Sequence, residues 1–433
     1  MSESYEPIFG KVAQSALTNP GHQKPHVLVL SERPPADFAH ADFLISWAPA
    51  PNTNTKFPPE ARAYQNEAQY LWRWILQLGP DFVVTENESL ATALDGKIPS
   101  GKTMPNSIKE PSAIRIELQK RASRSPIQVA EALSNHYGHK FGRVSYIPAL
   151  AMVGRLRLAE LTESDVTAEI AALAKSGKKP PVISGAAVSG HLIFAELGLK
   201  EDVITAAESG IKNPAHNEMS DSVFMICPLL AAAGRMSGED KYFQASVEHL
   251  ERMQDFCLRD DGIYRHSPLD EAAWGRGNGF PALGLAWTLS EMPADFPGQK
   301  KVLVSFQNHL SALAKHQDAS GMWHQVIDKP GSYREFTSTC MITFAMLRGM
   351  RNGWLDRDTF EPLSDRGWNA IKKRVSLDGK SIVDGCTGTG KQKSLQDYYL
   401  RTAILGPDDR CGAMALLLAT ERAFWEQKNA KAK

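Results

Sequence analysis

The chain has 433 residues, which is too long for one typical compact domain of about 100–200 residues, so two units are expected, or one large helical ring with a smaller domain. Lys+Arg and Asp+Glu number 49 each, so no field of one sign indicates nucleic acid or an anionic membrane as a partner. The five cysteines include no Cys-x-x-Cys pair and form a poor disulfide framework, so buried free thiols are expected.

The start of the chain, Met1–Gly21, is polar and lacks the charged-then-apolar pattern of a signal peptide. No apolar run reaches the roughly 18 residues of a membrane-spanning helix. We therefore expect a cytoplasmic protein with no membrane partner, or a periplasmic one if a signal peptide was removed.

Residues 26–95 predict a small α/β unit. Three short apolar runs, His26–Leu30, Asp42–Trp47 and Asp81–Thr85, are typical of strands. A helix is expected over Pro59–Leu78, between the second and third strands. Because no phosphate loop or nucleophile elbow follows these strands, a structural or docking role is favoured for this unit.

The segment Lys97–Pro126 is rich in Lys, Ser and Pro and is interpreted as a linker. The predicted domains are therefore a small α/β domain over residues 1–120 with a linker to about residue 126, and a helical domain over residues 127–433. About twelve helices are expected in the second domain, which fits six hairpins in a ring. They are Ile127–Tyr137, Ile147–Leu158, Asp165–Lys175, Ala187–Leu197, Val203–Ser209, Asp221–Met236, Tyr242–Leu258, Pro281–Leu289, Val302–His316, Ser338–Met350, Asp365–Val375 and Arg410–Phe424.

A helix followed by a glycine turn recurs through the C-terminal half. The turn glycines are Gly262, Gly321 and Gly379, separated by 59 and 58 positions. Such a repeat indicates stacked helical hairpins, and a period near sixty suits a closed ring better than an open solenoid. The turns would then carry their polar and aromatic side chains to the mouth of the ring.

Trp274–Phe280 alternates glycine with site-like side chains before the predicted helix Pro281–Leu289. Trp274 offers a flat face for a sugar ring, Arg276 a planar fork for a carboxylate, and Asn278 a further polar group. This alternation is hard to explain as packing alone, although glycine-rich turns before helices are common. We interpret the segment as a binding site rather than as a structural turn.

Asp221 opens an apolar helix, with Asn217 and Glu218 just before it. Taken alone, an Asp at this position is more often a helix cap than a catalytic group. A carboxyl held at the mouth of an apolar helix could also have a raised pKa and act as an acid. Both interpretations stay open on the pattern itself.

Two repeat turns end in histidine: His266 in one, and His324, followed by Gln325, in the next. Single histidines are usually structural, but two at equivalent turns would face the same mouth. No His-x-x-x-His and no carboxylate set at ligand spacing is present, so no metal and no cofactor are expected. Gly385–Lys391 nearly spells a phosphate-binding loop, but Gln392 stands where Ser or Thr is required, so a turn lining the ring is favoured.

From about Ile127 to Phe424 the chain resembles the unsaturated rhamnogalacturonyl hydrolases and their relatives, the unsaturated glucuronyl hydrolases. The matching pieces are Asp221–Met225, Trp274–Phe280, Met322–Asp328 with Gly331–Tyr333 and Glu335, Gly388–Gly390 with Asp397–Tyr399, and Gly412–Ala413 with Leu416–Leu417. The resemblance implies a mainly α fold, an (α/α)6 barrel of six hairpins, here preceded by the small α/β domain.

The resemblance further implies an enzyme that acts on oligosaccharides left by polysaccharide lyases. Such an enzyme protonates C4 of a 4,5-unsaturated uronic acid and adds water at C5, and the product collapses to release the sugar. Asp221 matches the family's acid/base. The substrate pocket would include His191, Asn217, His266, Trp274, Arg276, Asn278, Trp323, His324, Gln325 and Tyr333.

One departure from the family is visible in Ser184–Gly198, which contains no Asp where the family usually has a second one. His191 stands near that place. Two other hypotheses therefore remain: cleavage of saturated glycosides by Asp221 with Glu218 or Asp270, and a barrel that binds carbohydrate without turning it over.

Overall fold

The computed structural model describes residues 19–60, 67–178, 184–212 and 218–431. The N-terminal part is a parallel sheet in the order β2-β1-β3-β4, formed by β1 (His26–Ser31), β2 (Leu44–Pro49), β3 (Phe82–Val84) and β4 (Ser100–Gly101). Two helices accompany it, α2 (Glu67–Leu78) and α3 (Glu88–Leu94). The three predicted strands are confirmed. The predicted helix over residues 59–78 is confirmed for α2, and its residues 61–66 lie outside the described residues.

The interpretation of residues 97–126 as a linker is wrong for part of that segment, because it contains β4 and the helix α4 (Ala113–Ser123). Ser112 caps α4 by accepting a hydrogen bond from the Arg115 amide at 3.1 Å. The Arg115 guanidinium forms a buried ion pair with Asp81 at the start of β3. Only Arg115 and Leu118 of α4 are buried, so an ion pair rather than an apolar stripe holds this helix, and hydrophobic periodicity could not reveal it.

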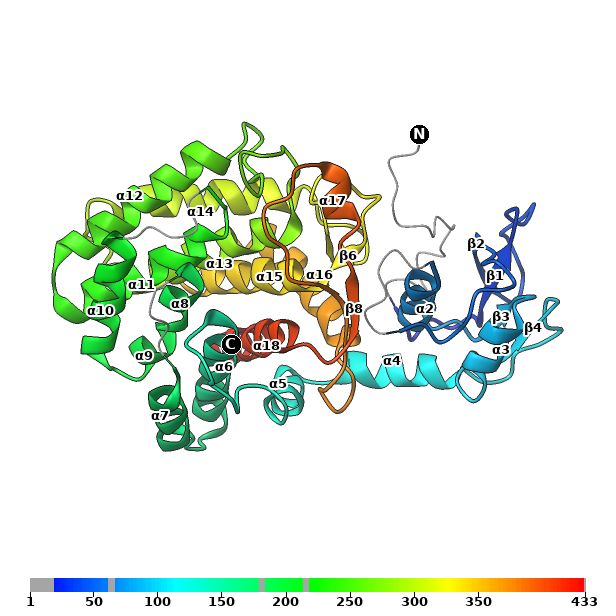
Figure 1. Ribbon diagram of the computed structural model, residues 1–433. Helices are drawn as coiled ribbons and strands as arrows, with labels where there is room; N and C mark the ends of the chain where they lie inside the picture. Colours follow the sequence, from blue (N-terminus) through cyan, green and yellow to red (C-terminus); the bar gives the residue numbers. More distant parts are fainter. Residues whose placement is uncertain (1–18, 61–66, 179–183, 213–217, 432–433) are drawn as a thin grey trace.

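The rest of the described chain forms six helical hairpins (Figure 1). In chain order the outer helices are α5 (Pro126–Ser134), α7 (Thr167–Ser176), α10 (Lys200–Lys212), α12 (Asp240–Cys257), α14 (Gln299–Ala314) and α16 (Arg357–Arg374). Their inner partners are α6 (Tyr146–Thr162), α8 (Gly185–Gly190) with α9 (Leu192–Glu196), α11 (Ser222–Ser237), α13 (Gly275–Glu291), α15 (Phe336–Arg351) and α18 (Asp409–Lys431).

The inner helices form a closed ring. Each one contacts the next, from α6 through α8, α11, α13 and α15 to α18, and α18 packs extensively against α6. The contact between the last and the first helix makes the ring a barrel rather than an open solenoid. The expected (α/α)6 barrel, preceded by a small α/β unit, is therefore confirmed.

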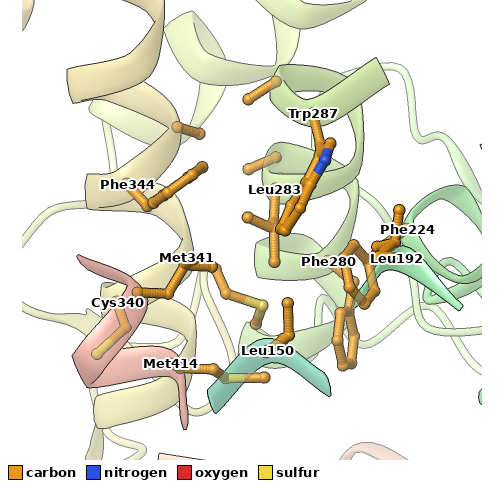
Figure 2. Close-up of a cluster of buried hydrophobic side chains, with 14 of the residues drawn as sticks. Leu150, Leu192, Phe224, Phe280, Leu283, Trp287, Cys340, Met341, Phe344 and Met414 are labelled. Carbon is orange, nitrogen blue, oxygen red and sulfur yellow. The ribbon is translucent and has the colours of Figure 1, made fainter. Parts of the chain in front are cut away.

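The centre of the barrel is filled by apolar side chains from all the inner positions. Figure 2 shows side chains of α6, α9, α11, α13, α15 and α18 pointing toward one another, among them Leu150, Leu192, Phe224, Trp287 and Met414. These five residues are at most 2% exposed. All five cysteines are free and buried, as expected. A ligand must therefore bind at an end of the barrel rather than inside it.

The turns from outer to inner helices share one end of the barrel, where every inner helix begins. Gly262, Gly321 and Gly379 have φ values of 84°, 89° and 79° at these turns. Residues other than glycine rarely adopt this left-handed backbone conformation, which explains why glycine recurs at these turns. The long turns before α13, α15 and α18 form the mouth of the barrel.

The sheet unit docks on this mouth through α2, which lies beside β8 in Figure 1. Arg73 of α2 forms an ion pair with Asp384 in β7 (Ile382–Cys386), and the Gln69 amide donates to the Ala403 carbonyl in β8 (Ala403–Gly406). Below the mouth, the Arg124 guanidinium donates to the Lys372, Val375 and Ser376 carbonyls at the end of α16, at 2.7–2.9 Å. The α/β unit is thus part of the wall around the mouth.

Candidate active site

Asp221 precedes α11 at the mouth of the barrel. It stands in the cap position, but its backbone is helical (φ −50°, ψ −30°) and its side chain makes no capping hydrogen bond. The hypothesis that Asp221 is merely a helix cap is therefore wrong. Its Oδ1 instead lies 3.4 Å from His266 Nε2, and the residue is 8% exposed.

His266 holds three segments of the mouth together. Its carbonyl accepts a hydrogen bond from the Ser220 amide at 3.0 Å, which fixes the turn before Asp221. Its Nδ1 lies 2.9 Å from the hydroxyl of Tyr398 in α17 (Leu395–Tyr399), and its ring centroid lies 4.4 Å from that of Trp274. The Tyr398 oxygen also accepts a hydrogen bond from the Gln392 amide at 3.2 Å. Burial raises the pKa of Tyr398, so its phenol stays protonated and can donate.

The glycines of Trp274–Phe280 turn out to be packing positions, and α13 begins at Gly275 rather than after the segment. A Cβ on Gly275 would lie 2.6 Å from the His324 carbonyl oxygen, and one on Gly279 would lie 2.6 Å from Met341 Cε. A Cβ on Gly277 would lie 3.0 Å from Ser220 Oγ and 3.5 Å from His266 Cδ2. The alternation therefore has a packing reason that the sequence interpretation missed: the glycines let α13 approach three neighbours closely.

Four buried polar atoms around Gly277 form no hydrogen bond with any part of the chain that the structure describes: Ser220 Oγ, Asp221 Oδ1, His266 Nε2 and Trp274 Nε1. Buried polar groups normally have partners. Four such atoms, just before α11 and in the connection that leads into α13, mark the place where a polar ligand would find donors and acceptors together.

Arg276 is buried, and its guanidinium lies 4.8 Å from the Trp274 ring centroid. It donates to the Cys386 and Thr387 carbonyls at 2.8 and 2.6 Å and to Thr337 Oγ1 at 3.4 Å. Arg276 therefore holds the turn after β7 against α13. Its binding of a substrate carboxylate stays a prediction. A substrate would have to share the guanidinium N–H groups with the Cys386 and Thr387 carbonyls.

Three further predicted residues have internal partners instead of facing Asp221. The Asn278 amide donates to the Tyr264 and Trp274 carbonyls, and its oxygen accepts from the Tyr264 amide at 2.7 Å. The Trp323 indole donates to the Leu313 carbonyl at 2.8 Å. His324 in β5 (Trp323–His324) contacts the Ser332 carbonyl through Nδ1 at 2.6 Å and Asp318 through Nε2 at 3.4 Å. The geometry favours structural roles for these three residues.

The remaining predicted residues differ in their surroundings. Gln325 donates to the Tyr398 carbonyl at 3.1 Å and so braces the partner of His266. Tyr333 lies under the Arg73 guanidinium at 5.4 Å, next to the α/β unit, and burial raises its pKa. His191, between α8 and α9, contacts the Ala187 carbonyl through Nδ1 at 2.7 Å. Asn217 lies outside the described residues.

Tyr398 and Glu335 are functional candidates that were quoted in the family resemblance without a role. Glu335 in β6 (Arg334–Glu335) is fully buried and caps α15 by accepting from the Thr337 and Ser338 amides. It also accepts from the Cys386 amide at 2.8 Å, which ties two turns of the mouth together. The contact of Glu335 with Cys386 and that of Tyr398 with His266 join residues 51 and 132 positions apart, so no local signal could have assigned these two contacts.

The near match to a phosphate loop, residues 385–391, begins with the last two residues of β7 and lies in the connection before α18. Arg276 holds its first carbonyls, and Lys391 Nζ lies 3.2 Å from Glu218 Oε2. The segment leads to α17, four residues after Lys391, rather than directly into a helix as a phosphate loop does. In the part of the chain that the structure describes, no group of three or more His, Cys, Asp or Glu side chains could hold a metal ion, and no helix is long and apolar enough to cross a membrane.

Comparisons with curated proteins find hydrolases of unsaturated oligosaccharides. The unsaturated 3S-rhamnoglycuronyl hydrolase of Alteromonas sp. is 25% identical over 37% of this chain, and the one of Formosa agariphila is 32% identical over 37%. The unsaturated rhamnogalacturonyl hydrolase YesR of Bacillus subtilis is 27% identical over 53% of this chain. The chain spans 42%, 47% and 67% of the lengths of these three relatives, respectively.

Solved structures share the fold. A glycosyl hydrolase family 88 protein from Bacteroides vulgatus superposes with a TM-score of 0.58 at 18% identity, over 70% of this chain and 100% of its own. A possible member of family GH105 from Salmonella enterica gives 0.60 at 18% identity, over 75% and 97%. Residues 204–424, about half of the chain, match the family model described as Glycosyl Hydrolase Family 88. Since this match includes Asp221, His266, Trp274 and Tyr398, the chain belongs to glycosyl hydrolase family 88.

Proposed function

We propose that this protein is a glycoside hydrolase that releases a 4,5-unsaturated uronic acid from the non-reducing end of lyase-generated oligosaccharides. The observation that carries the proposal is the cluster of Asp221, His266 and Trp274, whose buried polar atoms converge at the mouth of a family 88 barrel. The relatives named as unsaturated rhamnogalacturonyl and rhamnoglycuronyl hydrolases support the same substrate class.

The reaction is a hydration followed by collapse. Asp221 in its protonated form donates a proton to C4 of the enol ether, and positive charge develops at C5 and the ring oxygen. The Asp221 carboxylate then takes a proton from a water molecule as the water oxygen bonds to C5, which restores the acid. The resulting hemiketal opens, and the rest of the oligosaccharide leaves with the glycosidic oxygen. The double bond, and its ultraviolet absorbance, is lost.

His266 and Tyr398 would set the environment of Asp221. A neutral Tyr398 that donates its hydroxyl proton to His266 Nδ1, 2.9 Å away, leaves the proton of a neutral imidazole on Nε2. That N–H then faces Asp221 Oδ1 at 3.4 Å and stabilises the carboxylate after it has given up its proton. Ser184–Gly198 contains no Asp, and the described side chain paired with Asp221 is His266, whose Nε2 lies 3.4 Å from Asp221 Oδ1.

The test is the loss of ultraviolet absorbance when lyase-generated uronate oligosaccharides are added to the wild type and to Asp221→Asn. The wild type should bleach the signal, and the variant should lose at least about a hundredfold in kcat, as expected for removal of a general acid. Asp165→Asn, an exposed Asp far from the mouth, serves as the matched control and should behave as wild type. Bleaching at the wild-type rate by Asp221→Asn would remove Asp221 from the mechanism.

A second candidate is cleavage of saturated glycosides by two carboxyl groups. Burial raises the pKa of the Tyr398 phenol, and the charges of Asp270 and Asp221 raise it further, so both carboxyls are near enough to act on this side chain. Release of a chromogenic phenol from saturated uronides, abolished equally by Asp221→Asn and Asp270→Asn, would favour this reaction. Turnover of unsaturated substrates alone, with Asp270→Asn retaining activity, would exclude it.

A further inference from the structure

Arg410 lies in the first turn of α18, at the mouth of the barrel, and its Nε donates to the Tyr146 hydroxyl at 3.1 Å. Tyr146 begins α6, and its ring packs edge-on against Phe224 and Phe280, with centroid distances of 6.2 and 5.7 Å. Those two rings stack on each other at the centre of the barrel (Figure 2). Since the Phe224 amide donates to the Asp221 carbonyl at 3.0 Å, a short path of contacts leads from Arg410 to Asp221.

A second path of contacts leads from Arg410 to the Trp274 side of the site. A Cβ on Gly388 would have Arg410 Nη2 as its nearest neighbour, at 3.8 Å. Gly388 follows Thr387, whose Oγ1 is buried and has no hydrogen-bond partner among the described residues. The Thr387 carbonyl accepts from Arg276 at 2.6 Å, and the Arg276 guanidinium lies 4.8 Å from the Trp274 ring centroid. Arg410 therefore contacts the same group of side chains from two sides.

Three other cations at the mouth are held by partners within the fold. Arg276 and Arg401 donate to backbone carbonyls of residues 386–388. Lys391 pairs with Glu218 at 3.2 Å. By contrast, the hydrogen bond that the described chain offers Arg410 uses only Nε, so its terminal nitrogens Nη1 and Nη2 are available to a ligand.

Arg410 is also charged and accessible. Burial lowers the pKa of its guanidinium, but Tyr146 and Asp408 outweigh that effect and raise the pKa, so the group stays protonated. Its side chain is only partly buried, whereas Arg276 is 2% exposed. Gly388, next to Nη2, is exposed and has no side chain that could cover this edge of the guanidinium.

We propose that Arg410 binds the carboxylate of the unsaturated uronic acid and makes the enzyme select acidic sugars. The inference rests on the proposed function, since it names the residue that would hold that substrate beside Asp221. The two oxygens of a carboxylate match the paired N–H groups of a guanidinium. The carboxylate is attached to C5, next to the C4 atom that Asp221 would protonate, so its binding also orients the double bond. Arg276 would instead hold the turn after β7.

The test compares an unsaturated uronyl disaccharide with its uronate methyl ester, using the loss of ultraviolet absorbance. The wild type should prefer the free acid by about ten- to a hundredfold in kcat/KM, as expected for a charged hydrogen-bonded pair. Arg410→Gln should lose most of this preference, mainly through a higher KM for the acid. Arg410→Lys should keep part of it, because it retains the charge without the fork. Arg422→Gln, later in α18, pairs with Asp365 and is the control that should keep the full preference.

A second variant tests access to the guanidinium while Arg410 itself is kept. Gly388→Leu should lower the preference for the acid, because the new side chain would cover the edge of Arg410 that carries Nη2. Gly390→Leu is the matched control, since Gly390 is also exposed and a Cβ there would meet nothing within 4 Å. It should keep the wild-type preference.

The outcomes separate this inference from the proposed function. If the wild type bleaches the unsaturated substrate and Arg410→Gln keeps the full preference for the acid, the proposed function stands and the inference is wrong. Equal losses of activity on acid and ester in Arg410→Gln would also overturn it, because Arg410 would then only support the mouth through Tyr146. A wild type that bleaches neither compound would overturn the proposed function, and the inference with it.

Discussion

At the scale of single residues, the structure brings three of the predicted site residues together, Asp221, His266 and Trp274, and gives other predicted site residues partners inside the fold. Asp221 stands at the start of an apolar helix and Trp274 stands beside a glycine, so a local sequence pattern is enough to identify both residues. Tyr398 approaches His266 from the helix α17, 132 positions later, and no spacing rule connects two such positions. Trp323 and His324 occupy the equivalent position of the next repeat, yet their ring nitrogens contact the backbone carbonyls of Leu313 and Ser332 and not a ligand site.

Tyr398→Phe tests the proposed positioning of His266. Without the hydroxyl, His266 Nδ1 has no phenol to fix the tautomer, so the proton of the ring distributes over both nitrogens. We expect kcat to fall about ten- to a hundredfold with KM nearly unchanged, and the pH profile of kcat to shift because the Asp221 carboxylate is less well stabilised. Tyr399→Phe, next to it in α17, is the control. An unchanged pH profile of kcat would mean that Tyr398 packs against His266 without positioning its ring proton.

At the scale of elements, most inner and outer helices follow the predicted ranges, because they are long apolar or amphipathic segments. The inner helices α11, α13 and α15 are buried nearly all round. The glycine-rich start of α13 is the instructive exception. Its pattern was interpreted as a binding turn, but the segment is helical, and its glycines are spaced so that α13 fits against its neighbours. Function and packing coincide there, since the close approach is what brings Ser220, His266 and Trp274 together.

Gly277→Ala tests that close approach. The new Cβ would lie 3.0 Å from Ser220 Oγ and 3.1 Å from Trp274 Cε3, so either the side chains or α13 must shift by a few tenths of an ångström. We expect a folded protein with activity reduced about tenfold or more, because a small misplacement is costly in a catalytic site. Gly210→Ala in α10 is the matched control, since its Cβ would meet nothing closer than 3.6 Å. Equal activity in both variants would contradict this account.

Glu421 of α18 connects three helices near the opposite end of the ring. It is fully buried and pairs with Arg157 of α6 and with Arg348 and Arg351 of α15 at 2.6–3.1 Å. Burial raises its pKa, but the arginines, Arg348 foremost, outweigh that effect and lower the pKa to about 2. Because the folded pKa lies below the ordinary value of 4.5, this stabilisation is complete above pH 4.5 and is lost as the pH falls toward 2.

Glu421→Gln should therefore lower the free energy of unfolding at pH 7 by about 3–5 kcal/mol, because it leaves buried arginines without their carboxylate. The variant should also lose less stability than the wild type between pH 4.5 and 2.5. Urea unfolding at several pH values measures both effects. Glu426→Gln, at an exposed pair with Arg422 one turn later, should change stability by less than about 1 kcal/mol.

At the scale of the whole molecule, the sequence predicts the two kinds of architecture but not how they meet. Periodicity and the glycine repeat are local or regular signals, and they predict three strands of the α/β unit and the ring of hairpins. The parallel pairing of the strands comes from the structure. The docking of α2 on β7 and β8 depends on pairs such as Arg73 with Asp384, which are 311 positions apart and carry no sequence pattern. The helix α4, held by a buried ion pair, was missed for the same reason.

The last prediction concerns this docking. A double-mutant cycle with Arg73→Met and Asp384→Asn should give a coupling energy of about 1–3 kcal/mol, because both side chains are buried and the pair joins two units. The exposed pair of Lys102 and Glu88, 4.0 Å apart within the α/β unit, is the matched control and should couple by less than about 0.5 kcal/mol. Arg73→Met leaves Asp384 paired with Arg374, whereas Asp384→Asn leaves both Arg73 and Arg374 without their carboxylate, and the cycle separates these losses from the Arg73–Asp384 pair itself. Coupling no larger than in the control would mean that apolar contacts around Tyr70 and Tyr333, rather than charge, hold the α/β unit on the mouth.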